Sequence, residues 1–137
     1  MKLAFSVLVF SAVVFNCTST THPRRWTNYD RVTMNMTREA RTLYPHFTLL
    51  CNDCVAAYEM DVSPAGGPYF AQLNKDMLMK YPECLILWDP FFAHSLFFQT
   101  ELTKEELLQD TTVRVLKEYK YFDAEYLLLY RNSQTGR

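Results

Sequence analysis

The chain has 137 residues, of which 15% are aromatic, and carries 14 Lys and Arg against 15 Asp and Glu. This length suits one domain with one modest core, and the aromatic content argues against extended disorder. The balanced charge excludes the basic excess that nucleic acids and anionic membranes require. Five arginines between residues 22 and 46 are typical of a solvated surface. We therefore expect a globular protein without a nucleic-acid partner.

The N-terminus predicts a signal peptide. Lys2 precedes an apolar run over residues 3–15 that is too short to span a membrane, and small and polar residues follow it. Cleavage is expected after Ser19, and an uncleaved N-terminal anchor is the alternative. Removing residues 1–19 leaves 118 residues with 13 basic and 15 acidic side chains, a net charge of −2. We expect a protein that is secreted or held in the secretory-pathway lumen, with no membrane span after cleavage.

The mature chain divides into three predicted parts. Residues 20–29 offer no periodicity and predict an irregular lead-in, residues 30–131 form the globular domain, and residues 132–137 are a polar tail. Asn35-Met36-Thr37 is an N-glycosylation sequon, which gains weight beside a signal peptide. Asn35 is therefore expected on the surface, as a glycan acceptor in a eukaryotic host.

The first half of the domain predicts two helices and one strand. Apolar residues recur near helical spacing from Asp30 to Tyr44, and Pro45 ends that helix. Residues 47–51 favour a strand, whereas residues 55–62 fit a helix or a strand equally well. Residues 63–68 are the strongest break in the chain. A second helix is predicted from Pro68, which suits a first helical turn, to residue 81.

The second half predicts strands around one well-marked helix. The apolar run over residues 84–88 is typical of a strand covered on both faces, and residues 95–99 and 126–130 favour two further strands. Thr103 and Glu106 form a capping box before an apolar stripe, which predicts a helix over residues 104–118. The alternation predicts an α/β or α+β domain with a three- to four-stranded sheet and two or three packed helices.

The cysteines carry the most specific chemistry. Cys51, Cys54 and Cys84 remain after the predicted cleavage, and earlier cleavage would add Cys17. In an oxidising compartment we expect Cys51 or Cys54 to form a disulfide with Cys84, which would contribute ~3–4 kcal/mol. The third thiol would then stay free or link two chains into a disulfide-bonded homodimer.

Two alternatives use the same cysteines. Residues 47–50 lead into Cys51-x-x-Cys54, and together with the later segment 126–132 they resemble thioredoxin-like proteins, whose first thiol lies at a helix N-terminus that lowers its pKa. The chain departs from that family at two places. Leu50 stands where the family has an aromatic residue, and Asp123-Ala124-Glu125 stand where the family has a cis-proline. The resemblance implies thiol–disulfide exchange at Cys51 and Cys54. A zinc site would instead combine the three cysteines with His46 or His94.

No other catalytic motif is present in the sequence, which lacks a nucleophile elbow, a metalloprotease helix, a P-loop and a dinucleotide-binding turn. Scattered acidic residues, including Asp89, show no spacing that pairs two of them on one face. We therefore expect a non-enzymatic binding protein, with a protein partner or a small apolar ligand and no cofactor, resident metal or catalytic residue. A thiol–disulfide oxidoreductase that uses Cys51 and Cys54 is the alternative.

Overall fold

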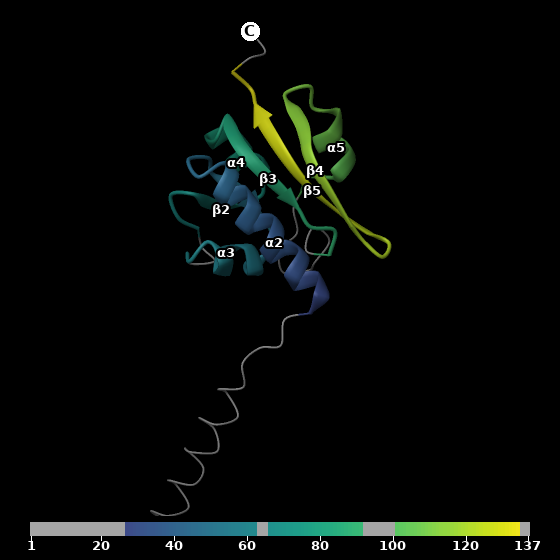
Figure 1. Ribbon diagram of the computed structural model, residues 1–137. Coiled ribbons are helices and arrows are strands. Elements are labelled where there is room, and N and C mark those ends of the chain that lie inside the picture. The colour runs from purple at the N-terminus through teal and green to yellow at the C-terminus, as the bar shows by residue number, and fades with distance from the viewer. Residues whose placement is uncertain (1–26, 63–65, 92–100, 135–137) are drawn as a thin grey trace, which may run out of the picture.

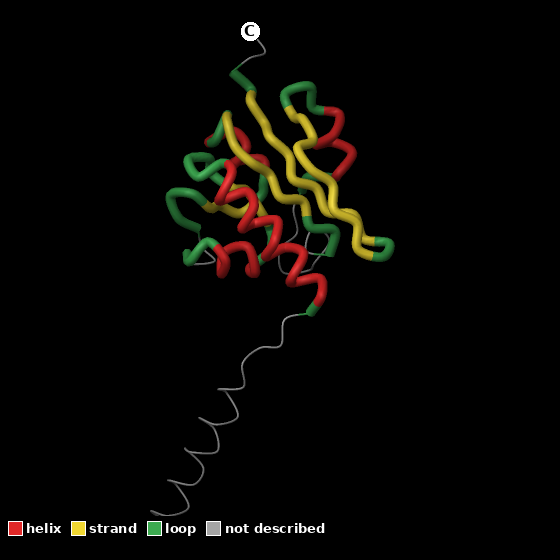
Figure 2. The backbone as a smooth tube through the Cα atoms, viewed as in Figure 1, coloured by secondary structure: helices red, strands yellow, loops and turns green. Residues whose placement is uncertain are grey.

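The computed structural model describes residues 27–62, 66–91 and 101–134. Within them a five-stranded sheet has helices on both faces, in a single small domain (Figures 1 and 2). The elements in chain order are α2 (Asn28–Leu43), β1 (Leu49–Cys51), α3 (Cys54–Glu59), β2 (Phe70–Gln72), α4 (Lys75–Lys80), β3 (Glu83–Trp88), α5 (Lys104–Gln109), β4 (Val113–Tyr121) and β5 (Ala124–Asn132). The predicted mixed class is confirmed, but the sheet has more strands than we expected.

The sheet is parallel on one side and antiparallel on the other. Its order is β2-β1-β3-β5-β4, with β1 parallel to both β2 and β3, and with β5 antiparallel to both β3 and β4. After β1 the chain passes through α3 to β2, and after β3 it passes toward α5 and β4. The connections that follow β1 and β3, two neighbouring parallel strands, therefore lead to opposite sides of the sheet.

Alternating strand residues bury two hydrophobic clusters, one on each face of the sheet. Leu85 and Leu87 of β3 pack with the helices α2 and α3, whereas Cys84, Ile86 and Trp88 pack with α4 and α5. Each of these β3 residues is buried. The prediction of a strand covered on both faces is thus confirmed by β3.

Local signals explain two of the helices. Thr27 and Asp30 form a capping box at the start of α2, which confirms the N-terminal helix and begins it at Asn28. The segment that the sequence left undecided folds as α3, because the Asp53 side chain accepts a hydrogen bond from the Val55 N–H and caps the first turn.

Two predicted helices were wrong in extent. The helix expected over residues 104–118 ends at Gln109, after its capping box at Thr103 and Glu106, and Val113 begins the long strand β4. The segment 68–81 forms β2 first, and α4 begins only after Asn74, whose side chain accepts from the Met77 N–H at 2.8 Å. In both segments the apolar spacing also suits a strand, and pairing with a neighbouring strand decides the outcome. The strand predicted over residues 95–99 lies outside the described residues.

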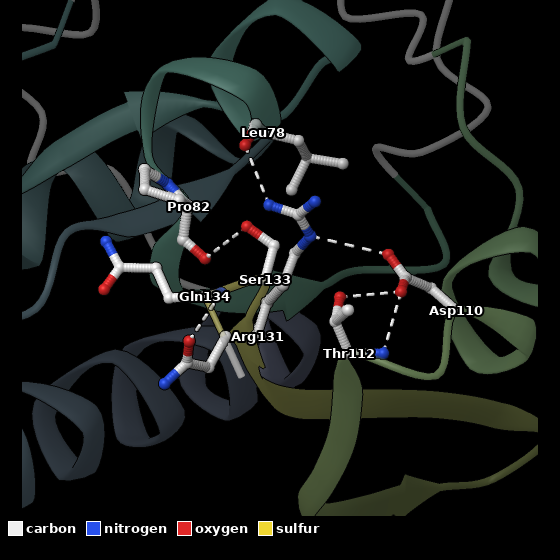
Figure 3. A network of polar contacts seen from close by, with 8 residues as sticks. Leu78, Pro82, Asp110, Thr112, Arg131, Ser133 and Gln134 are labelled. Atoms are coloured by element: carbon white, nitrogen blue, oxygen red, sulfur yellow. Dashed lines mark hydrogen bonds and ion pairs between the residues drawn. The ribbon is translucent and has the colours of Figure 1, made fainter. Parts of the chain in front are cut away.

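A polar network closes the end of the sheet where β5 ends (Figure 3). The Asp110 carboxylate accepts from the Thr112 N–H at 2.9 Å and so forms the turn that separates α5 from β4. Arg131 of β5 donates to the Leu78 carbonyl of α4 at 2.8 Å and lies 3.4 Å from Asp110. Ser133 donates to the Pro82 carbonyl at 3.2 Å. This network joins α4, β5 and the turn before β4.

Candidate functional site at the carboxyl edge of the sheet

The polar residues of interest follow two neighbouring parallel strands. Asn52 and Asp53 come directly after β1, and Asp89 comes directly after β3. Parallel strands bring their carboxyl ends to the same edge, and open α/β sheets bind ligands outside that edge, where the connections of neighbouring strands diverge. The strands β1 and β3 meet this condition, so this edge is the candidate site.

Asp53 and Asp89, here called the acidic pair, are 2% and 5% exposed. The Asp89 carboxylate accepts from the Thr33 hydroxyl of α2 and from the Phe91 N–H, both at 2.8 Å. The Val55 N–H donates to Asp53 at 2.7 Å. Backbone and hydroxyl donors from three segments therefore hold both carboxyl groups under the N-terminal half of α2.

The pKa of Asp53 is raised from its usual 3.8 to about 7, mainly by burial and to a smaller extent by the negative charge of Asp89, while the hydrogen bond from Val55 opposes the shift. A carboxyl group with that pKa is about half protonated at neutral pH. Asp53 is thus a buried group that exchanges a proton in the physiological range.

Several buried polar atoms have no hydrogen-bond partner, and three of them belong to Asn52 and Tyr126, near the acidic pair. Among the described residues they are the Tyr126 hydroxyl, the Thr37 hydroxyl and both amide atoms of Asn52. Tyr126 is fully buried, and its pKa is raised by that burial and then by the charges of Asp89 and Asp53. Unsatisfied buried groups are uncommon in folded proteins and point to a water, an ion or a ligand.

Five aromatic residues, here called the aromatic row, lead from the acidic pair to the surface. Ring centroids lie 6.4 Å apart between Tyr126 and Phe91, 4.4 Å between Phe91 and Tyr29, 5.1 Å between Tyr29 and Tyr121, and 4.7 Å between Tyr121 and Phe122. Phe122, in the turn between β4 and β5, is 83% exposed with φ of 55°. Bulky side chains rarely adopt that backbone conformation, and such outliers gather at functional sites.

A small hollow opens beside Asp53. Its lining includes Cys51, Asn52, Cys54 and Gln72, and its cavity volume of about 20 Å³ holds about one water molecule. The two cysteines of the Cys-x-x-Cys motif therefore border the same hollow as one member of the acidic pair.

The described cysteines Cys51, Cys54 and Cys84 are free thiols in the structure. Cys51 packs on the face of the sheet covered by α2 and α3, and Cys84 packs on the opposite face. A disulfide between these two would have to cross the sheet, so the fold does not bring them together. The structure contains no bridge from Cys51 or Cys54 to Cys84, and a disulfide at Cys54 stays a prediction.

The Cys-x-x-Cys pair also differs from the arrangement that the thioredoxin resemblance implied. Cys51 is the last residue of β1, and the second cysteine, Cys54, is the first residue of α3. Burial, with a smaller contribution from the charge of Asp53, raises the pKa of Cys51 well above its usual value. The first thiol is therefore stabilised in its protonated form.

The remaining predicted residues do not join the site. Asn35 is exposed on α2, as a glycan acceptor requires, and glycosylation stays a prediction. His46 is exposed in the turn before β1, and His94 lies outside the described residues. Throughout residues 27–62, 66–91 and 101–134, no group of three Cys, His, Asp or Glu side chains is arranged to hold a metal ion. The zinc set of three cysteines and a histidine is thus not assembled in this part of the chain.

The acidic pair was not predicted from the sequence. Asp89 shows no spacing that pairs it with another acidic residue, and Asp53 lies between the two cysteines of the Cys-x-x-Cys motif. The usable signal is that each aspartate comes within two residues of the end of a strand-like run, at 47–51 and 84–88. Had these two strands been recognised as parallel neighbours, the rule for ligand sites in open sheets would have brought the aspartates together.

None of the helices in the described part of the chain has the length and apolar character needed to cross a membrane. Comparison of the chain with protein-family models, with curated proteins and with solved structures finds no match.

Proposed function

We propose that this chain is a small secreted binding protein that holds a small-molecule ligand at the carboxyl edge of its sheet. The observation that carries the proposal is the gathering of buried, unpartnered polar side chains, Asn52 and Tyr126, around the acidic pair where β1 and β3 end. Ligand sites typically combine a mostly apolar wall with a few polar groups in fixed positions. The aromatic row supplies such a wall, and the acidic pair supplies the polar groups.

This arrangement favours a ligand with two unlike ends. A polar or positively charged group suits the acidic pair, and a planar or apolar body suits the partly exposed rings of Phe91 and Tyr29. The sequence alone predicted a protein partner or a small apolar ligand. The buried carboxyl groups and the unpartnered atoms of Asn52 and Tyr126 favour a small ligand with a polar group over a wholly apolar one, because an apolar ligand would leave Asn52 and Tyr126 unpaired.

The test is a thermal-shift screen of the mature protein against polar, cationic and apolar small molecules, followed by backbone amide NMR of every hit. We expect hits to perturb the amides of Asn52, Asp53 and Asp89 at the carboxyl edge and to leave Ser133, at the opposite edge, unchanged. The variant Asn52→Ala should weaken binding at least several-fold, whereas Gln109→Ala, on an exposed face of α5, should not. Hits that perturb only residues far from the carboxyl edge would contradict the proposal.

Thiol–disulfide exchange at Cys51 and Cys54 remains the alternative, because both thiols border one hollow. It has less support, since Cys51 is fully buried and its pKa is raised. An exchange assay with a small aromatic disulfide at pH 7 separates the two functions. A binding protein should react slowly, and mainly at Cys54. Rapid turnover that is lost in both Cys51→Ser and Cys54→Ser would favour the oxidoreductase.

A further inference from the structure

The acidic pair consists of two carboxyl groups in the protein interior, where charged side chains are rare. Asp53 and Asp89 are almost fully buried and lie close enough for the charge of one to act on the other. A buried charge is costly unless a proton, an opposite charge or a metal ion compensates it. A bound cation would compensate both carboxylates at once, whereas a proton compensates only one.

Neutral oxygen atoms surround the pair. The Thr33 hydroxyl lies 2.8 Å from an Asp89 carboxylate oxygen. The Tyr126 hydroxyl is fully buried without a hydrogen-bond partner, and it lies where the charges of Asp89, Asp53 and Asp30 all act on it. The amide of Asn52, next to Asp53, is likewise buried and unpartnered. These orphaned groups are independent evidence that something beyond the described side chains occupies this end of the sheet.

The donor set limits which ion would fit. It consists of oxygen atoms, which suit hard divalent cations rather than zinc or copper(I). Asp53 and Asp89 would supply two carboxylates, so much of the shell would be water or neutral oxygen. Mg²⁺ is commonly held by one or two carboxylates and keeps several of its waters, whereas Ca²⁺ takes six to eight oxygen ligands. The hollow beside Asp53 has space for about one water, on the side of this carboxyl group that Asn52, Cys54 and Gln72 line.

We propose that Asp53 and Asp89 bind a divalent cation of the Mg²⁺ type at the carboxyl edge of the sheet, with Thr33, Asn52 and Tyr126 as neutral oxygen groups around it. This inference rests on the proposed function, because the ion would connect the acidic pair to an anionic or polar group of the ligand. It also accounts for the two buried carboxyl groups and for the unpartnered hydroxyl.

The experiment uses Mn²⁺ as a probe for a Mg²⁺ site. Electron paramagnetic resonance measures free Mn²⁺ while the mature wild-type protein is titrated at pH 8, and Mg²⁺ is then added as a competitor. We expect one bound Mn²⁺ per chain, displaced by Mg²⁺. Asp53→Asn and Asp89→Asn should each weaken binding at least tenfold. The control Asp123→Asn, at an exposed turn residue, should bind like the wild type.

The pH dependence provides a second measurement. Because the cation must displace any proton bound to the carboxyl groups that hold it, affinity should fall as the pH is lowered. The other titratable groups whose charges act on this site are Asp30 and Tyr29 of α2, Cys51 of β1 and Tyr126 of β5. Single variants at the three of these positions that are not proposed to hold the ion, Asp30→Asn, Tyr29→Phe and Cys51→Ala, should leave the pH midpoint within one unit of the wild-type value.

Two outcomes would overturn the cation site: a folded wild-type protein that binds no Mn²⁺ at millimolar concentration and pH 8, or unchanged affinity in both asparagine variants. Circular dichroism reports whether each variant is folded, and the wild-type titration is decisive without them. Repeating the ligand screen in EDTA separates this inference from the proposed function. Hits that still map to the carboxyl edge in EDTA would preserve that function while Mn²⁺ binding fails.

Discussion

Replacing Asp53 with asparagine should change how the stability of this protein depends on pH. The folded pKa of Asp53 lies above its unfolded value, so the folded state binds this proton more tightly. The resulting contribution to stability is fully present below about pH 4 and is lost as the pH rises through about 7. A shift from 3.8 to about 7, at 1.36 kcal/mol per pH unit, corresponds to about 4 kcal/mol.

Asparagine keeps the shape of the side chain and the oxygen that accepts from the Val55 N–H, but it does not titrate between pH 4 and 8. The free energy of unfolding of Asp53→Asn should therefore rise, relative to wild type, by about 4 kcal/mol between pH 4 and pH 8. Carboxyl groups with a lowered pKa, such as Glu39, make a contribution to protein stability that grows with rising pH. This contribution is the same in both proteins, so it cancels in the difference between the variant and the wild type.

The assay is urea unfolding of the protein with a reducing agent and EDTA, followed by circular dichroism at pH 4, 6 and 8. Asp123→Asn serves as the control, and its stability should parallel that of the wild type at each pH. If Asp53→Asn and wild type also gave parallel profiles, Asp53 would not carry a buried proton, and the electrostatic account of the acidic pair would be refuted.

Four further outcomes follow from the same structure. Tyr126→Phe should stabilise the metal-free protein by ~1 kcal/mol, because it removes an unpaired buried hydroxyl. A urea midpoint below that of the wild type would mean that this hydroxyl has a partner. Arg131→Met should destabilise by ~1–3 kcal/mol in the same assay, because it leaves the Leu78 carbonyl without its donor, whereas the exposed Arg114→Met should have little effect. Phe122→Asn should stabilise by ~0.5–1 kcal/mol, because asparagine tolerates positive φ, and a loss of stability would contradict the strained turn. Mass spectrometry after brief alkylation of the native protein should show modification first at the half-buried Cys54, and equal labelling of all three thiols would contradict the burial of the other two.

The sequence by itself determined the elements whose local signals agree with one another. The capping box at Thr103 and Glu106 predicted where α5 begins, and the polar pattern after Asp30 predicted most of α2. The unbroken apolar run of residues 84–88 predicted β3 as a strand buried on both faces. In each case the information lies within one or two turns of helix, or within one strand.

Some segments have an apolar spacing that fits both a helix and a strand, and only the tertiary structure decided which of the two they form. Leu116 and Tyr119 suit a helical stripe, yet this segment pairs with β5 as the strand β4, with a bulge between Val115 and Lys117. The pairing satisfies the backbone hydrogen bonds of β5 on its outer side, a benefit that residues 113–121 alone do not reveal. Residues 70–72 similarly become β2, because β1 offers them an edge to pair with.

The candidate site depends on the same tertiary information. Asp53 and Asp89 are 36 positions apart in the chain, and each ends a short strand whose partner is not apparent from its own residues. The parallel pairing of β1 with β3 brings the two carboxyl groups together, and α2 then covers them with Thr33. Composition and spacing determined that two aspartates follow two strands. The strand order decided that they share one buried edge, because Coulombic coupling depends on distance in space rather than along the chain.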